Sequence, residues 1–150
     1  MKIKHIWSVL AKESVINQDD NNLSIYGVLE ELSVNLAPFD NSGKLPDKIG
    51  VPLNYEIVSM WKKEKGISLI KAEVEFTLID PENKELLRNI QNIEIPNNLK
   101  RLRSRMKISG LPLSVSGDYT FQVKVREEEN KKFNLVAKIP LEVKVNLEKK

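Results

Sequence analysis

The last third of the chain alternates apolar and polar side chains in two stretches, residues 119–126 and 135–147. In both stretches the apolar residues hold odd positions, beginning with Tyr119 and Phe121 in the first. A period of two places one row of side chains on a buried face and the next row in water, so each stretch is predicted to be a half-buried strand. The charged break between them, residues 127–132, is typical of a turn, and the pair therefore predicts an antiparallel hairpin.

Five earlier segments also carry strand patterns. In the first of them apolar residues occupy both odd and even positions, which is expected of a strand that is covered on both faces. The second is long for one strand, so Gly27 within it is expected to mark a bulge or bend. Clusters of turn-forming residues such as 17–22 separate the segments. The five segments are residues 3–12, 23–36, 53–61, 67–79 and 100–113.

Two connections need separate treatment. Residues 38–52 contain three prolines and two glycines and are predicted to form a long surface loop. The next connection, residues 80–84, is compatible with a helix start or with a hairpin turn. Apolar side chains in 86–93 fit helical spacing, whereas Ile93 and Ile95 fit a strand. We favour a hairpin turn followed by a strand, which leaves no long helix in the chain.

A chain of 150 residues can bury a hydrophobic core without disulfides or metals, and one domain spanning residues 1–150 is the simplest expectation. Strands joined by turns, without a long helix, predict two packed antiparallel sheets. The core is expected to be one cluster of aromatic and aliphatic side chains: Tyr55, Trp61, Phe76, Tyr119, Phe121, Val123, Ile139, Leu141 and Val143.

The segment 117–121 reads Gly-Asp-Tyr-Thr-Phe and follows Leu-Pro-Leu at 111–113. It resembles the Gly-x-Tyr step into the penultimate strand of immunoglobulin-like sandwiches, where the tyrosine hydroxyl bonds back to nearby backbone. Phe121 stands where antibody domains place a cysteine, and Trp61 is the candidate for the core tryptophan. The resemblance implies an all-β, antiparallel immunoglobulin-like β-sandwich of about seven to eight strands.

Over nearly its whole length the chain also resembles a family of small prokaryotic β-sandwich proteins classed as a domain of unknown function. That resemblance implies a sandwich and brings no catalytic residues with it. Its landmarks are the opening strand with its turn, the strand that contains Gly27, Val58-Ser59-Met60-Trp61, Leu78-Ile79-Asp80-Pro81, residues 117–121 and Ile139-Pro140-Leu141-Glu142-Val143.

The charge of the chain is unevenly distributed. The net charge is +3, from 24 basic and 21 acidic residues. Five cations lie in a stretch without an acid between Glu94 and Asp118: Lys100, Arg101, Arg103, Arg105 and Lys107. On a strand the last four would share one face at intervals of about 6.6 to 6.8 Å and form a cationic ladder. Such a ladder suits a polyanion, or it protects an edge strand from pairing with another chain. We favour edge protection, because no aromatic residues interleave with the arginines to stack bases.

Catalytic and metal chemistry have few candidate residues. The absence of cysteine excludes disulfides, thiolate-bound metal and thiol chemistry. His5 is the only histidine, so neither a Ser–His nucleophile pair nor a histidine metal cluster is expected. The acidic groups at 19–20 and 127–129 lie in predicted turns, and those at 30–31 point to opposite faces of a strand. No catalytic, cofactor-binding or metal-binding residue is predicted.

The expected function is therefore a non-catalytic β-sandwich module for protein binding or assembly, with a protein partner or self-association, in a prokaryotic cytoplasm or a phage context. The alternative is polyanion or nucleic-acid binding through the basic strand Arg101 to Lys107, and an enzyme with an unrecognised site comes third. The first residues include basic side chains and an apolar run, but this run is too short for a signal peptide. No other apolar segment is long enough to cross a membrane. A membrane partner is not expected.

Overall fold

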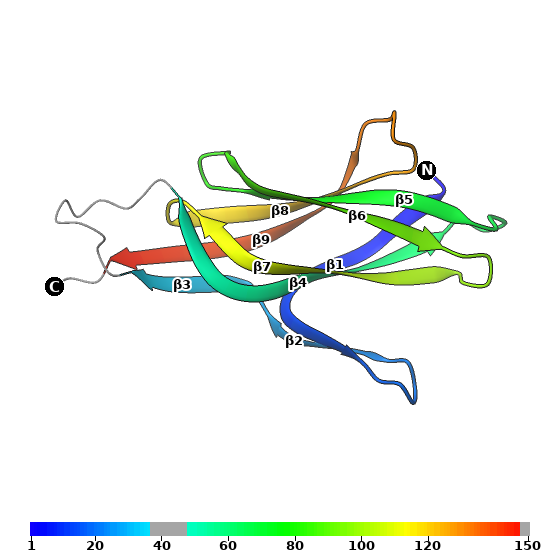
Figure 1. Cartoon of the computed structure of the whole chain (residues 1–150), viewed down its shortest axis with the longest axis horizontal. Coiled ribbons are helices and arrows are strands. Elements are labelled where there is room, and N and C mark those ends of the chain that lie inside the picture. Colours follow the sequence, from blue (N-terminus) through cyan, green and yellow to red (C-terminus); the bar gives the residue numbers. More distant parts are fainter. Residues whose placement is uncertain (37–47, 148–150) are drawn as a thin grey trace.

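The computed structural model describes residues 1–36 and 48–147. Within them the chain is all-β and forms nine strands in two sheets that pack together (Figure 1). The sequence predicts seven to eight strands, and the difference arises because residues 23–36 form two strands. The strands are β1 (Ile3–Ile16), β2 (Leu23–Val28), β3 (Glu31–Leu36), β4 (Ile49–Lys63), β5 (Ile70–Ile79), β6 (Glu85–Ile95), β7 (Arg101–Leu113), β8 (Gly117–Arg126) and β9 (Asn134–Leu147). No helix in the part of the chain that the structure describes is long and apolar enough to cross a membrane.

The two sheets differ in strand direction. The first, which we call sheet A, has the order β2-β1-β4-β7, and all its pairs are antiparallel. The second, sheet B, has the order β3-β9-β8-β5-β6 and is mixed, because β3 runs parallel to β9. The prediction of antiparallel sheets is thus wrong for this pair. The predicted hairpin of residues 119–147 is confirmed as β8 and β9.

The parallel pair follows from the way the chain crosses between the sheets. Gly27, near the end of β2, has a positive φ of +63°, although the pairing of β2 with β1 continues past it without a register shift. Leu29 then donates its N–H to the carbonyl of Leu10 in sheet A, at 2.8 Å. Glu30 accepts the N–H of Glu142 in sheet B, at 2.9 Å. The chain therefore leaves the edge of one sheet and enters the edge of the other, where β3 runs in the direction of β9.

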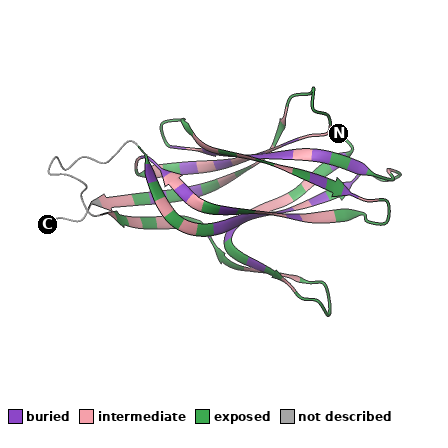
Figure 2. Cartoon of the chain, viewed as in Figure 1, coloured by how far each residue is buried: buried purple, intermediate pink, exposed green. Residues whose placement is uncertain are grey.

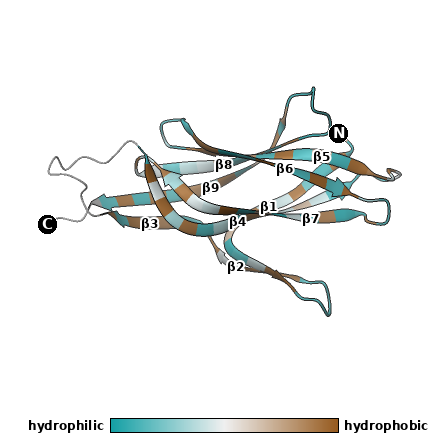
Figure 3. Ribbon diagram, viewed as in Figure 1, coloured by the Kyte–Doolittle hydropathy of each residue, from teal (hydrophilic) through white to brown (hydrophobic). Residues whose placement is uncertain are grey.

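The core lies between the two sheets. More and less buried residues alternate along β3 and β8, whereas β4 and β5 each contain a run of consecutive buried residues; Figures 2 and 3 show burial and hydropathy along the strands. The predicted core residues are confirmed as buried members of one cluster, except Ile139, which is partly buried and packs against it. Phe121 and Tyr55 contact across the interior, with ring centroids 6.0 Å apart. The predicted inward faces of β4, β5 and β8 are therefore correct.

Of the two connections predicted from the sequence, the loop is partly wrong and the hairpin turn is confirmed. The loop predicted at 38–52 is wrong for residues 49–52, which belong to β4; residues 38–47 lie outside the described residues. Pro52 falls where the pairing with β7 shifts between Val51 and Asn54, and such an irregularity accommodates a residue that cannot donate to the ladder. The hairpin turn favoured at 80–84 is confirmed, and β6 follows it.

Asp80 organises that hairpin turn. One of its carboxylate oxygens accepts the N–H groups of Glu82 and Lys84, at 2.9 and 2.7 Å. The other accepts the hydroxyl of Ser114 at 2.6 Å, from the connection between β7 and β8. Burial alone would raise the pKa of Asp80, but these hydrogen bonds outweigh it and hold the pKa below its ordinary value. The carboxylate therefore joins two turns that belong to different hairpins.

The predicted tyrosine corner is confirmed beside it. The hydroxyl of the fully buried Tyr119 donates to the carbonyl of Val115 at 2.6 Å and accepts the N–H of Ser114 at 2.8 Å. Gly117 is required here because its φ is +144° and a Cβ would lie 2.8 Å from the Pro81 ring. These contacts fix the point where the chain crosses from β7 in sheet A to β8 in sheet B.

We expect Tyr119→Phe to lower the free energy of unfolding by about 1 to 3 kcal/mol, because it leaves the buried N–H of Ser114 and the partly buried carbonyl of Val115 without their partner. Chemical denaturation measures the change. Tyr26→Phe is the matched control, since Tyr26 is exposed on β2 and its loss of a hydroxyl should have no effect. Equal stability of the two variants would contradict a structural role for the corner.

The effect of Asp80→Asn should depend on pH. Because the folded-state pKa of Asp80 is lowered, its stabilisation is present above the ordinary value of about 3.9 and is lost as pH falls through the lowered pKa. Asp80→Asn should therefore have a lower free energy of unfolding than the wild type at neutral pH. This difference should disappear in acid, where the carboxylate of the wild type is protonated. Urea denaturation from pH 7 to pH 2 tests this. A gap that stays constant over that range would show that the carboxylate charge contributes nothing.

Candidate functional site

The outer face of sheet A brings together residues that are far apart in the sequence. Directly paired residues of antiparallel strands point to the same face, so the register of β4 with β1 and β7 aligns side chains in cross-strand rows. From one end of the sheet inward, the rows are Lys4–Lys62–Arg101, Trp7–Met60–Arg103, Val9–Val58–Arg105 and Ala11–Glu56–Lys107. We call the first two rows, together with Lys100 in the preceding turn, the cationic face.

The first row contains three like charges. Lys4, Lys62 and Arg101 are all exposed and lie on neighbouring strands, which are about 4.8 Å apart in a sheet. Like charges directly opposite each other destabilise a sheet. Among the described residues the ion pairs lie elsewhere, on the outer face of sheet B and in turns. The row thus concentrates positive charge that no carboxylate of the described chain neutralises.

The surface around this row is concave. A hollow of about 540 Å³ is lined by Ile6, Trp7, Met60, Lys62, Lys100 and Arg101. A second, of about 600 Å³, lies between the tip of the β1–β2 hairpin and the start of β7, and also includes Met60. A third, of about 700 Å³, includes Lys4, Lys62, Lys65 and Lys100 with the single acid Glu64. Because they share lining residues, the three hollows adjoin along the cationic face.

The β1–β2 hairpin forms one wall of this surface. It departs from the sandwich on the outer side of sheet A, at the lower right of Figure 1. Arg103 donates to the side-chain oxygen of Asn21 at 2.9 Å, and Arg105 donates to the carbonyl of Ser14 at 3.4 Å. The Ser14 hydroxyl in turn donates to the buried carboxylate of Glu56. Two of the arginines predicted to form the ladder therefore also hold the hairpin in place.

The five sequence-predicted cations are brought together only in part. Lys100 lies in the turn before β7, and the other four lie on the outer face of β7. Arg101 and Lys107 are exposed, whereas Arg103 and Arg105 are partly buried. The strand is an edge strand, as the protective interpretation requires. Gln91 of β6 covers that edge at one point by donating to the carbonyl of Arg105 at 3.3 Å.

Sequence reasoning missed Lys4, Lys62 and Trp7. They lie on other strands, and only the register brings them beside Arg101 and Arg103. The sequence neighbours of Lys4 and Lys62 do not distinguish them from the other lysines of the chain, so no local pattern could have identified the row. The sequence disfavours nucleic-acid binding because no aromatic residue lies among the arginines of β7. In the folded chain an aromatic residue of another strand does lie near them, because Trp7 of β1 shares a cross-strand row with Arg103.

Lys63, next to Lys62, points the other way and is buried. Its ammonium group donates to the carbonyls of Ser68 and Pro96, both at 2.8 Å, and to that of Asn97 at 3.4 Å. These carbonyls belong to the β4–β5 and β6–β7 connections. Lys63 therefore fixes the turn that carries Lys100 and adds one positive charge beneath the hollows.

The only histidine lies beside a serine, although the sequence predicts no Ser–His nucleophile pair. The Nε2 atom of His5 lies 2.7 Å from the hydroxyl of Ser8, which is itself 2.7 Å from the hydroxyl of Ser59. The pair faces the interior, where the His5 ring packs edge-on against Trp61 with centroids 5.2 Å apart. Burial lowers the pKa of His5, and Ser59 is fully buried. These contacts are those of a partly buried histidine that packs against the core and is hydrogen-bonded through Nε2.

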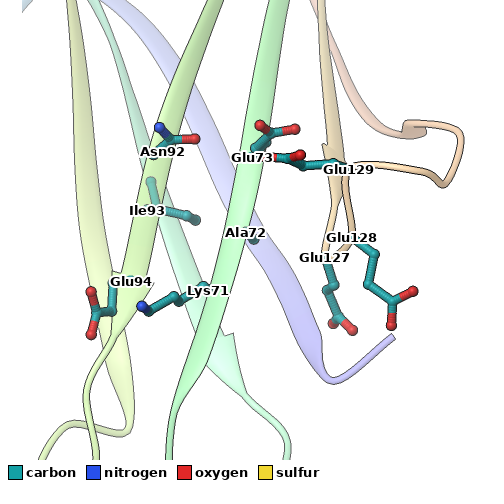
Figure 4. Close-up of a pocket in the computed structure, with 9 residues that line it drawn as sticks. All are labelled: Lys71, Ala72, Glu73, Asn92, Ile93, Glu94, Glu127, Glu128 and Glu129. Atoms are coloured by element: carbon teal, nitrogen blue, oxygen red, sulfur yellow. The ribbon is translucent and has the colours of Figure 1, made fainter.

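A separate hollow of about 450 Å³ is acidic (Figure 4). In Figure 4 the side chains of Glu127 and Glu128 point away from those of Glu73 and Glu129. Glu73 is paired with Arg126 at 2.6 Å, and Glu127 accepts the N–H of Ile3 at 2.8 Å. Across residues 1–36 and 48–147 no three acidic or histidine side chains are arranged to hold a metal ion. Glu73 and Glu127 are therefore used in contacts within the chain.

Comparison with known proteins adds no assignment to these surfaces. No protein-family model and no curated protein matches the sequence. The functional inference therefore rests on the geometry of the cationic face.

Proposed function

We propose that the chain is a non-catalytic binding module that holds a polyanion on the cationic face of sheet A. The observation that carries this proposal is the row Lys4–Lys62–Arg101, which extends from the edge strand β7 across the central strand β4 to β1. Protection of a sheet edge requires charge on the edge strand alone. It does not account for cations on β4 and β1, whereas a ligand that carries several negative charges does.

The electrostatics of the face support the same function. A concave surface lined by charges of one sign focuses its field and raises the local concentration of oppositely charged ligands. The outer face of sheet B provides the contrast, because Glu73 pairs with Arg126 and Glu75 lies 3.8 Å from Arg88. Ion pairs thus lie on the outer face of sheet B, whereas among the described residues none involves the cations of the row Lys4–Lys62–Arg101.

The proposal includes an immunoglobulin-like topology. The order β1-β4-β7 corresponds to strands A, B and E of that fold, and β9-β8-β5-β6 corresponds to G, F, C and C′. The tyrosine corner before β8 supports this assignment. Trp61 departs from the pattern, since it lies on β4 in the B position rather than on strand C. Membership of the family of small prokaryotic sandwich proteins, and a cytoplasmic location, belong to the same proposal.

A protein-binding or assembly module is the second candidate, and the β1–β2 hairpin favours it. Val15, Tyr26 and Val28 are 44, 55 and 51% exposed there, although each is apolar or aromatic. β2 is also an edge strand with one side unpaired in its sheet. An exposed apolar edge of this kind can pair with a strand of another protein or of a second copy.

The polyanion proposal predicts that inorganic polyphosphate binds and that its affinity falls steeply with salt. On nucleic acids each neutralised phosphate contributes about −0.7 to −0.9 to the slope of log affinity against log salt concentration. The double variant Lys62→Gln/Arg101→Gln should therefore lower the magnitude of the slope by about 1.5. Isothermal titration calorimetry at several salt concentrations measures the affinities.

The matched control is Lys138→Gln/Lys144→Gln, which removes the same charge from exposed positions on β9 in sheet B. It should leave the slope nearly unchanged. The Lys62→Gln/Arg101→Gln variant should also be at least as stable as the wild type, because it relieves repulsion between directly opposed charges. Equal loss of binding in both double variants would contradict a site on the cationic face.

The second candidate predicts self-association through the hairpin. Tyr26→Ser/Val28→Ser should reduce any concentration-dependent increase in molecular mass, because it removes the exposed apolar surface of β2. Sedimentation velocity over a hundredfold concentration range measures this. A wild-type chain that stays monomeric over that range would contradict assembly through a second copy.

A further inference from the structure

The two tryptophans of the chain have different environments. Trp61 is fully buried, and its indole N–H donates to the hydroxyl of Ser104 at 2.9 Å. Trp7 is only partly buried, and it lines the hollow that contains Lys62, Lys100 and Arg101. Within the described residues its N–H has no hydrogen-bond partner. Packing of the core therefore explains Trp61 but leaves Trp7 unexplained.

A β-bulge directs Trp7 to the cationic face. The register of β1 with β4 shifts between His5 and Trp7, so that Lys4 pairs with Lys62 and Trp7 pairs with Met60. In a regular strand Ile6 would follow Lys4 on the outer face and Trp7 would point into the core. The extra residue reverses this, and bulges often re-aim a side chain in this way beside functional sites. Ile6 is left 50% exposed as a consequence.

The bulge places a flat aromatic group one row from three cations. Adjacent rows on one face of a strand are about 6.7 Å apart, a span that a nucleotide can bridge between its phosphate and its base. Met60 and Arg103 share the row of Trp7. A thioether and a guanidinium group both pack well on aromatic surfaces. The surface thus offers charge for a phosphate and, beside it, an apolar and planar contact for a base.

From these observations we infer that the polyanion is a single-stranded nucleic acid and that Trp7 stacks on one of its bases. This inference rests on the proposed function and adds the ligand class to it. Non-specific binders of single strands combine a positively charged groove with aromatic side chains on which bases stack. A duplex hides the faces of its bases within the helix, so stacking on Trp7 requires unpaired nucleotides.

The shape of the site favours a nucleic acid over a membrane surface. Exposed apolar residues near the cations, Ile6 and Leu99, form walls of the hollows. A flat bilayer requires apolar groups that protrude from the surface and enter the lipid. A flexible single strand can instead follow a concave path between the β1–β2 hairpin and the start of β7.

The test uses a fluorescein-labelled oligothymidylate of about ten nucleotides, within the range of single-strand site sizes. Fluorescence anisotropy should show that Trp7→Leu weakens binding about 5- to 150-fold, as expected for loss of one base-stacking contact. Trp7→Tyr should restore most of the affinity. Tyr26→Leu, which replaces an exposed aromatic residue outside the hollows, should have no effect. Inorganic polyphosphate, which has no bases, should bind the wild type and Trp7→Leu equally.

Intrinsic fluorescence gives a second readout. Unlabelled oligothymidylate should quench the emission of Trp7 in the wild type and leave that of the buried Trp61. In Trp7→Tyr the quenching should disappear although the strand still binds. This measurement keeps the inference testable if Trp7→Leu fails to fold, which thermal melting would reveal. An oligouridylate of equal length shows whether RNA or DNA is the tighter ligand, and tight binding of either supports the inference.

Three results would overturn the inference: unchanged oligothymidylate affinity in a folded Trp7→Leu, equal affinity for duplex and single strand, or binding to phosphatidylserine vesicles without binding to the oligonucleotide. If polyphosphate binds through Lys62 and Arg101 but the oligonucleotide shows no dependence on Trp7, only this inference fails. If neither ligand binds, the proposed function fails with it.

Discussion

The register of β4 between β1 and β7 is the constraint on which both the core and the cationic face depend. Paired residues point to the same side of a sheet, so this register sends Ile57 and Trp61 into the core and Met60 and Lys62 outward. A shift by one residue would exchange the two faces. Burial of the large apolar side chains forbids that shift, and the alignment of cations on the outer face follows from the same packing. The site thus gains its geometry from the interior of the protein.

The ends of the sandwich are held by polar contacts rather than by apolar packing alone. At one end Asp80, Ser114 and Tyr119 join the β5–β6 turn to the crossing between β7 and β8. Near the cationic face Lys63 joins the turns before β5 and β7 through carbonyl oxygens. Each of these buried groups is satisfied, which is the condition for a polar group to fix geometry without destabilising the fold. The start of β7, including Arg101, therefore has a defined position relative to β4.

Local patterns in the sequence predict much of the fold but little of the site. Alternation identifies β8 and β9, and the Gly117 step identifies the tyrosine corner, because both depend on neighbouring residues. The division of residues 23–36 is missed, since the polar and apolar pattern does not show which sheet a strand joins. The row formed by Lys4, Lys62 and Arg101 is missed for a related reason. It depends on two pairings between distant residues, Lys4 with Lys62 and Lys62 with Arg101, and the local pattern of the sequence does not show either of them.

Lys62 and Lys63 show why charge spacing alone cannot assign a function. They are adjacent, yet Lys63 is buried with three carbonyl partners and Lys62 is exposed between two other cations. The first contributes to folding, because its hydrogen bonds offset the loss of hydration. The second opposes folding slightly, because its neighbours repel it. Arg105 and Arg101 differ in the same way, since one holds the hairpin and the other lines an open hollow. The cations without an internal role are the ones that a ligand would neutralise, and three of them, Lys62, Lys100 and Arg101, line the hollow that contains Trp7.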